Sequence, residues 1–598
     1  MGRFRTSNNR DYPNNAGHEH SRKPPSLAIP SRRATYRSAL SAYIIRFDGG
    51  GAVMQLRRAH RPADPDQPVA IAIGELLRAT ADRFPDRIAL IEGTADRRAR
   101  RRVAYSQLLA LAEAGARDLL RRFPNGGNIA IWAPNSIEWV IFEFSAALAG
   151  LPLVMINPSL TGHEATYILQ QSKAVAIFVA EKYRDNPLAR RVDEIKHTLP
   201  RLVSITNLSA WSNALQPGTG LDIALPVVRP EAMAAIQYTS GTTGKPKGAV
   251  QTHMAATNVS LAVTKRMATA KGSTWLLPLP LYSVGGSIYK VLGSLWNEGS
   301  LIILPDFDEA LILQLVEEEN VVFFSAVPTM YLRLLDHADF GKHNLKSLDV
   351  LCCGGSTVPE ELVRKIERSF GAEYIMMFGL TEMCGAVCQT VRGDTTYHKA
   401  RTIGKPLPGI ELKIVSLESG EIIGIGEPGE MCVRGIGRIK EYFDMAEATA
   451  TAIDEEGWLH TGDIGTIAED GYCAITGRLK DMIRRGGMNI YPREIEDVLV
   501  THGAIAEAVA FGIADEQWGE QVAVCIRLRQ GESSPTIAEL QTFLREHIAR
   551  HKVPKFWEFV DGFPVNAMGK VQKNILRDEF IARQSLGARQ SKKGSHVH

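Results

Sequence analysis

The sequence lacks several features that define major protein classes. It contains no run of about 18 consecutive apolar residues, so it predicts no transmembrane helix. Its 7 cysteines are too few and too scattered, in 598 residues, for a disulfide framework, and we expect free, buried thiols in a reducing compartment. The sequence also lacks a large excess of charge of either sign, since 69 Lys and Arg residues nearly balance 66 Asp and Glu residues. The net charge of +3 provides no basic footprint, so we expect no nucleic-acid partner. Without a long apolar run, we also expect no integral membrane segment.

What is present indicates a globular chain with more than one domain. A content of 45% hydrophobic and 23% charged residues is typical of folded proteins and excludes pervasive disorder. A chain of this length exceeds what one ordinary hydrophobic core accommodates.

The first 60 residues differ from the rest, because they carry 11 Lys and Arg but only 3 Asp and Glu and show no apolar period. We predict that they are disordered or belong to a mis-assigned start, with Met54 preceding the first well-patterned segment. An Arg-rich, acid-poor transit peptide is the alternative. Residues 584–598 are likewise predicted to be an unordered tail.

Short apolar runs then alternate with amphipathic segments, which predicts parallel sheets covered by helices. The expected strands are Ile129–Ala133, Leu153–Ile156, Val175–Ala180, Ala234–Tyr238, Leu301–Leu304, Val321–Val327 and Leu348–Cys353, and the expected helices include Glu164–Gln171, Glu309–Glu318 and Glu360–Phe370. Glu411–Val415 and Glu430–Arg434 resemble an antiparallel β subdomain. A small α+β domain follows, with a helix at Pro492–Leu499. The predicted fold class is therefore α/β, with a large N-terminal and a small C-terminal domain.

The most informative segment is YTSGTTGKPKG, Tyr238–Gly248. Its glycines let the backbone approach a ligand, while its hydroxyls and lysines offer donors and positive charge to a polyphosphate. It is not a Walker loop, because two residues rather than four separate Gly241 from Gly244, and Pro246 follows Lys245. A solvated turn is the alternative interpretation.

This segment resembles the signature loop of the adenylate-forming superfamily, which includes acyl-CoA synthetases. The further family motifs follow in order as FGLTE (Phe378–Glu382), GEMCVRG (Gly429–Gly435), WLHTGD (Trp458–Asp463), GRLKDMIRRGGMNIYPREIE (Gly477–Glu496) and NAMGK (Asn566–Lys570). The resemblance covers roughly residues 65–580. It implies an AMP-binding adenylation domain at 61–479 and a mobile C-terminal lid domain at 480–583.

The resemblance also implies which residues bind ATP. The phosphate loop would comprise Thr239, Ser240, Gly241, Thr242, Thr243, Gly244, Lys245 and Lys247. Gly354, Gly355 and Ser356 would form the adenine-binding turn, with Phe378 and Gly379 beside it, although a plain strand-to-helix turn is the alternative. Asp463 and Arg478 would bind the ribose hydroxyls.

The resemblance implies catalytic residues in both domains. Thr381 would contact the α-phosphate, and Glu382 would bind Mg²⁺, which prefers one or two carboxylates plus phosphate oxygens. Lys570 would stabilise the charge that develops at the α-phosphate. Lys480 falls at the family's hinge, and Gly486 and Gly487 would face the CoA side.

The acyl pocket is expected to be apolar and is formed in this interpretation by Tyr282, Ser283, Gly285, Val327, Met330 and Met383. Ser283 departs from the family, in which His is usual. Lys290 is also unusual, and we expect it to extend outward to solvent, the alternative being a contact with a second substrate charge. Only one acidic residue, Glu298, lies in Trp275–Ser300, so an α-amino acid would find no counter-ion. An uncharged tail is the expected substrate feature.

The resulting hypothesis is an acyl-CoA ligase that uses ATP, Mg²⁺ and coenzyme A to activate a medium- or long-chain fatty acid or an aryl acid. Its expected partners are the small-molecule acid and CoA, its expected location is cytoplasmic, and a homodimer is left open. Two alternatives are an adenylating enzyme that loads a separate carrier-protein phosphopantetheine, and a non-catalytic binding protein.

Overall fold

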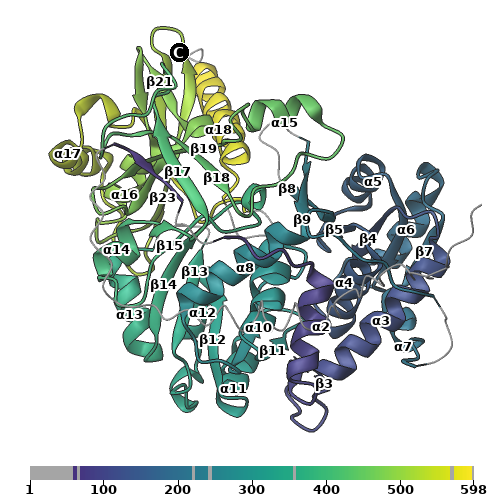
Figure 1. The fold of residues 1–598 in the computed structure, drawn as a ribbon. Coiled ribbons are helices and arrows are strands. Elements are labelled where there is room, and N and C mark those ends of the chain that lie inside the picture. Colours follow the sequence, from purple (N-terminus) through teal and green to yellow (C-terminus); the bar gives the residue numbers. More distant parts are fainter. Residues whose placement is uncertain are drawn as a thin grey trace, which may run out of the picture. The chain divides into compact units, whose positions relative to one another are not determined.

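A computed structural model describes residues 58–63, 67–218, 223–239, 245–354, 358–565 and 571–594, with side chains described up to residue 584. Four β-sheets organise these residues (Figure 1). Among the described helices, none combines the length and apolar character that a bilayer crossing requires. All seven cysteines are free and buried, as the sequence predicts.

The first sheet has six strands in the order β7-β6-β4-β5-β8-β9, of which only the β8–β9 pair is antiparallel. Its strands are β4 (Asn128–Trp132), β5 (Leu153–Ile156), β6 (Ala174–Val179), β7 (Ser204–Asn207), β8 (Met233–Thr239) and β9 (Lys247–Thr252). Its connecting helices are α3 (Tyr105–Arg122), α4 (Ile137–Ala149), α5 (Gly162–Gln171), α6 (Leu188–Ile195) and α7 (Leu208–Asn213). Continuous apolar strands such as β4, buried at all of its positions, are typical of a parallel sheet covered on both faces.

The second sheet has nine strands in the order β16-β15-β14-β13-β12-β10-β11-β2-β3, and the six from β14 to β2 are parallel. The nine strands of this sheet are β2 (Ile88–Glu92), β3 (Arg102–Ala104), β10 (Thr274–Leu277), β11 (Ser300–Ile303), β12 (Val321–Ala326), β13 (Val350–Gly354), β14 (Glu373–Phe378), β15 (Cys388–Gln389) and β16 (Lys405–Pro406). Its helices are α2 (Ile73–Arg83), α8 (His253–Met267), α9 (Val284–Gly286), α10 (Gly293–Trp296), α11 (Glu309–Glu318), α12 (Pro328–Leu335), α13 (Glu360–Phe370) and α14 (Thr396–Arg401).

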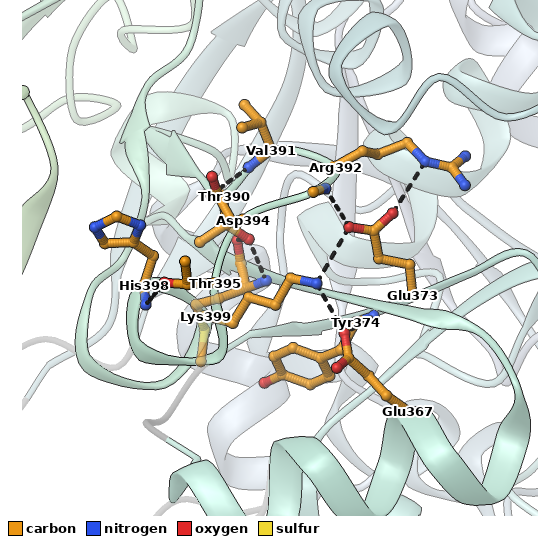
Figure 2. A network of polar contacts seen from close by, with 12 residues as sticks. Glu367, Glu373, Tyr374, Thr390, Val391, Arg392, Asp394, Thr395, His398 and Lys399 are labelled. Atoms are coloured by element: carbon orange, nitrogen blue, oxygen red, sulfur yellow. Dashed lines mark hydrogen bonds and ion pairs between the residues drawn. The ribbon is translucent and has the colours of Figure 1, made fainter.

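A polar network fixes the start of two neighbouring strands of this sheet (Figure 2). The buried amine of Lys399, on α14, lies 2.8 Å from Glu367 Oε1 of α13 and 3.1 Å from Glu373 Oε1 at the start of β14. Arg392 pairs with Glu373 at 3.2 Å and with Asp349, which immediately precedes β13. These ion pairs hold the amino ends of β13 and β14, so the opposite, carboxyl ends are held in a fixed register.

The third sheet is antiparallel, in the order β1-β17-β18-β19-β20. It consists of β1 (His60–Arg61), β17 (Ile410–Val415), β18 (Gly429–Gly435), β19 (Leu459–Ile467) and β20 (Cys473–Arg478), with α15 (Ala446–Ala452) before β19. The predicted antiparallel β subdomain is confirmed, since Glu411 pairs with Arg434 and Val415 with Glu430. The prediction that residues 1–60 lie outside the fold is wrong for Ala59 and His60, because Ala59 is fully buried and His60 pairs with β17.

The fourth sheet has the order β22-β21-β24-β23, with β25 parallel to β24. It contains β21 (Ile483–Arg485), β22 (Met488–Ile490), β23 (Ile505–Asp515), β24 (Gly519–Leu528) and β25 (Phe556–Phe559), packed with α16 (Pro492–Leu499), α17 (Ile537–His547) and α18 (Lys573–Gly594). The helix α18 continues beyond the predicted start of the unordered tail, because Ala, Leu, Arg, Gln and Lys in this stretch are good helix formers.

Candidate active site

The predicted phosphate loop joins two antiparallel strands. Thr239 ends β8 and pairs with Lys247 at the start of β9, so these two strands are the arms of a hairpin. Ser240, Gly241, Thr242, Thr243 and Gly244 lie outside the described residues. Lys245 is exposed, and the Lys247 amine lies 5.1 Å from the ring centroid of Tyr442. Two cations are therefore held at the hairpin, where polyphosphate binding is proposed.

Glu382 is brought to the same hairpin from a distant segment. It lies with Thr381 in a 3₁₀ turn, Thr381–Met383, shortly after β14. The hydroxyl of Tyr442 donates a hydrogen bond of 2.7 Å to Glu382 Oε1. Burial is the main cause that raises the pKa of Tyr442, the negative charge of Glu382 raises it further, and the phenol therefore stays protonated. A half-buried carboxylate that shares Tyr442 with Lys247 of β9 fits a Mg²⁺ ion, which favours oxygen ligands of this kind.

A chain of amide side chains connects this turn to the predicted acyl pocket. Gln251 Nε2 lies 3.5 Å from the Thr381 carbonyl oxygen and donates at 2.9 Å to Gln237 Oε1. Gln237 in turn donates at 2.7 Å to the carbonyl oxygen of Tyr282. Both glutamines are buried, on β8 and β9. The sequence interpretation missed them and Tyr442, although a buried amide in each of two apolar strands was a usable signal.

The predicted adenine-binding residues lie at the carboxyl ends of neighbouring parallel strands. Gly354 ends β13 and pairs with Met377, while Phe378 ends β14. A Cβ on Gly379 would lie 1.8 Å from the Gly385 carbonyl oxygen, so only glycine fits this turn. Gly355 and Ser356 lie outside the described residues. Carboxyl ends of parallel strands are the usual ligand-binding edge of an α/β sheet.

The predicted ribose-binding pair is assembled by the antiparallel sheet. Asp463 of β19 pairs in register with Arg478 of β20, and Arg478 Nε lies 2.8 Å from Asp463 Oδ1. Asp463 is buried, whereas Arg478 is exposed. The pair therefore presents a carboxylate beside a guanidinium, and carboxylate oxygens are the acceptors that ribose hydroxyls require.

The predicted acyl-pocket residues are distributed over three segments. Tyr282 and Ser283 immediately precede α9, which contains Gly285, and the Ser283 hydroxyl donates at 2.8 Å to the Pro280 carbonyl oxygen. Val327 caps α12 directly after β12, and Met383 is fully buried in the turn with Thr381.

Met330, the sixth predicted residue, packs against the core that surrounds β12 and β13.

The expectation that Lys290 extends outward is wrong. It lies in a π-helical turn, Ser287–Leu292 (η2), with 1% of its surface exposed. Its ammonium lies 3.9 Å from the ring centroid of Phe323, on β12. The side chain points inward because the turn packs against α8 and β10 and all six of its residues are buried.

The C-terminal site residues are on short connections. Lys480 is exposed in the 3₁₀ turn Leu479–Asp481, which joins β20 to β21. Gly486 and Gly487 form the β21–β22 turn with φ of 57° and 81°, which glycine adopts without strain. Lys570 lies outside the described residues.

This fold, with a glycine-rich hairpin, a carboxylate turn and an Asp–Arg pair at the ends of three sheets, defines an adenylate-forming enzyme. The model of the AMP-binding enzyme family matches residues 77–443, and that of the AMP-binding enzyme C-terminal domain matches residues 494–570. The chain therefore belongs to the AMP-binding enzyme family, among its acyl-CoA synthetases, and is an AMP-forming acid–CoA ligase.

Individual relatives agree with this assignment. The chain is 35% identical over 547 residues to YngI of Bacillus subtilis (strain 168), whose acyl-CoA synthetase name is itself provisional, covering 87% of this chain and 98% of that protein. It is 33% identical to a mitochondrial medium-chain acyl-CoA ligase of Mus musculus, covering 86% and 88%. Among solved structures, o-succinylbenzoate CoA synthetase from Bacillus subtilis, in complex with its acyl-adenylate intermediate, superimposes with a TM-score of 0.73 at 27% identity, covering 85% and 98%.

Proposed function

We propose that this enzyme activates a medium- or long-chain fatty acid or an aryl acid in two half-reactions. In the first, a carboxylate oxygen of the acid attacks the α-phosphorus of ATP, which forms the acyl-adenylate and releases pyrophosphate. In the second, the thiol sulfur of CoA attacks the acyl carbon, the thiol loses its proton, and AMP leaves with the electrons of the broken C–O bond. The relatives named above support this two-step chemistry. The choice of a fatty or aryl acid rests on the residues expected to line the acyl pocket.

The observation that carries the proposal is the convergence on the β8–β9 hairpin. Lys247, Tyr442 and Glu382 come from three separate segments, yet Tyr442 contacts both of the charged side chains. A Mg²⁺ ion held by Glu382 would neutralise phosphate charge. Lys247 and Thr381 would orient the β- and α-phosphates, and preorganised groups of this kind stabilise developing charge without reorganising.

The remaining site residues complete the assignment. Asp463 and Arg478 would hold the ribose, and Gly354 with Phe378 would border the adenine. Lys570, on the lid formed by residues 480–583, would approach the α-phosphate only during adenylation. Gly486 and Gly487 would replace it when CoA reacts, after rotation at Lys480.

The walls of the acyl pocket favour apolar acids over α-amino acids. The side chains of Val327, Met330 and Met383 are apolar, and each methylene that an acyl chain buries against such side chains contributes about 0.8 kcal/mol. An α-ammonium would lack a counter-ion in the segment Trp275–Ser300, because its only acid, Glu298, is paired with Arg83 at 3.0 Å, and an uncompensated buried charge costs several kcal/mol.

Pyrophosphate release tests the proposal when hexanoate, octanoate and benzoate are compared with leucine and phenylalanine, each with and without CoA. We expect release with the three acids and CoA-ester formation only when CoA is present. Faster release with either amino acid would contradict the pocket assignment. Acyl-adenylate that reacts with a carrier-protein phosphopantetheine but not with CoA would favour the second candidate function.

A further inference from the structure

Lys290 occupies an unusual segment of the enzyme. The turn Ser287–Leu292 has π-helical hydrogen bonding between two short α-helical segments, α9 and α10. Such π-turns are rare, and they occur frequently at functional sites. All six residues of this turn are buried, and Lys290 is among the largest fully buried side chains of the described residues.

The Lys290 amine has no carboxylate partner among the described residues. Its described neighbours are the face of Phe323, at 3.9 Å, and the thiol of Cys352 on β13. Burial lowers the pKa of this amine to about 7, and Cys352 opposes the change only in part. Keeping an uncompensated ammonium inside a protein costs several kcal/mol. A lysine retained under that cost points to a partner that the chain itself does not provide.

Two further buried polar groups beside Cys352 are also without hydrogen-bond partners among the described residues. They are the hydroxyl of Tyr289 and the hydroxyl of Ser325, both buried. Ser325 pairs in register with Cys352, and it lies two residues after Phe323, on the same face of β12. The Cys352 thiol interacts electrostatically with both Tyr289 and Lys290. We call Tyr289, Lys290, Ser325 and Cys352 the Lys290 cluster.

The Lys290 cluster adjoins the three chain segments that form the proposed acyl pocket, which contain Gly285, Val327 and Met383. Gly285 and Lys290 belong to one continuous helical segment. Ser325 precedes Val327 on the strand that leads into the pocket. A Cβ on Gly385, two residues after Met383, would lie 2.8 Å from the Tyr289 hydroxyl and 2.6 Å from Val284 Cγ2. The cluster therefore lies beside the apolar residues expected to contact the acyl chain.

We propose that Lys290 is a specificity-determining residue that binds a second carboxylate at the far end of the acyl substrate, so that the enzyme prefers dicarboxylic acids. This inference rests on the proposed function, and it replaces the expectation of an uncharged tail. A carboxylate would supply the missing counter-ion and would accept hydrogen bonds from the ammonium and from the hydroxyls of Tyr289 and Ser325. The apolar walls of the pocket would contact the methylenes or the ring between the two carboxylates.

The discriminating experiment compares matched acids of equal length. The rate of pyrophosphate release is measured for octanoate and octanedioate, and for shorter and longer pairs, with the wild-type enzyme and the Lys290→Met variant. Lys365→Met, at an exposed helix position, is the matched control. Tyr289→Phe, which removes only the hydroxyl, is a second variant that keeps the packing.

We expect wild type to have a higher kcat/KM for the best dicarboxylic acid than for its monoacid partner. Lys290→Met should lower kcat/KM for that dicarboxylic acid about 100-fold, mainly through KM, because a buried carboxylate would lose its counter-ion. The same variant should leave the monoacid within about threefold or improve it. Tyr289→Phe should lower the dicarboxylic rate about tenfold, and the control should change neither.

Two results would overturn the inference. If monoacids are activated but Lys290→Met leaves the ratio of the two acids unchanged at every length, the inference fails and the proposed function stands. If neither acid type releases pyrophosphate with the wild-type enzyme, the proposed function fails, and the inference fails with it.

Discussion

At the scale of single residues, Tyr442 connects the two charged groups assigned to the ATP phosphates. Its hydroxyl donates to Glu382, and its ring faces the Lys247 amine. A hydrogen bond to a charged group contributes about 1.5–3 kcal/mol when it is well formed. The orientation of Glu382 therefore depends on a side chain outside every recognised motif.

Replacing Tyr442 by Phe should remove that orientation and keep the ring. We expect pyrophosphate release to fall about tenfold, which corresponds to about 1.4 kcal/mol, and the Mg²⁺ concentration for half-maximal rate to rise severalfold. Steady-state rates at varied Mg²⁺ measure both effects. Tyr397→Phe, at a residue with 60% exposure, is the control. An unchanged Mg²⁺ dependence would show that Glu382 needs no such support.

Lys290 should make the stability of the enzyme depend on pH. The amine keeps its proton to about pH 10.5 in the unfolded chain but releases it near pH 7 when folded, so the unfolded state binds more protons between these values. Stability should therefore rise with pH across that range. Cys352, the neighbouring thiol, stays neutral over most of it, because burial raises its pKa to about 11.

Lys290→Met should remove this dependence. The variant should be more stable than wild type by on the order of 3–5 kcal/mol near pH 7, since each pKa unit corresponds to about 1.4 kcal/mol. That advantage should shrink as the pH approaches 10. Melting temperatures of the ligand-free proteins at several pH values measure it, with Lys365→Met as control. A variant that is less stable than wild type near pH 7 would contradict the claim that the buried Lys290 amine destabilises the folded protein.

At the scale of elements, the site is built where strands end. Gly354 and Phe378 close β13 and β14, while Thr239 and Lys247 close β8 and open β9. The ion pairs of Lys399 and Arg392 hold the other ends of β13 and β14 (Figure 2). Strand register at one edge thus determines side-chain positions at the other.

Gly379→Ala tests the turn that leads from β14 to Glu382. Its Cβ would meet the backbone of Gly385 at 1.8 Å and of Ala386 at 2.7 Å, and neither can move without displacing the turn. We expect a loss of about 1–3 kcal/mol in stability and a larger loss of pyrophosphate release. Gly341→Ala, where a Cβ meets nothing within 4 Å, is the matched control. Equal behaviour of the two variants in both assays would contradict the account.

The sequence predicts these elements well and their contacts poorly. The helix bounds Glu309–Glu318, Glu360–Phe370 and Pro492–Leu499 are confirmed, because amphipathic period and caps are local signals. The burial of Lys290 is not local, since it arises from a π-turn packed under β12. Tyr442 meets Glu382 only through the fold, so no spacing in the sequence could indicate that contact.

At the scale of the whole molecule, the account predicts two separable half-reactions. Lys480 lies in the short turn between β20 and β21, and proline there would fix φ near −65° and remove a backbone N–H. Lys480→Pro should preserve pyrophosphate release and lower CoA-ester formation at least tenfold. Lys570→Ala should do the opposite, with adenylation falling about 10²–10³-fold.

Both half-reactions are measured separately, the first by pyrophosphate release without CoA and the second from supplied acyl-adenylate. Lys552→Met, at an amine paired with Glu494, serves as a charge-removal control within the same domain. If Lys570→Ala lowers both half-reactions equally, or Lys480→Pro lowers neither, residues 480–583 do not act as a moving lid.

The central claim is that the chain is an acid–CoA ligase that acts through an acyl-adenylate. A product analysis of one reaction, with ATP, Mg²⁺, CoA and the best acid found, tests it most directly. The account predicts AMP, pyrophosphate and acyl-CoA in equal amounts, with acyl-adenylate accumulating on the enzyme when CoA is omitted. Formation of ADP and inorganic phosphate, or of acyl-CoA without AMP, would contradict it.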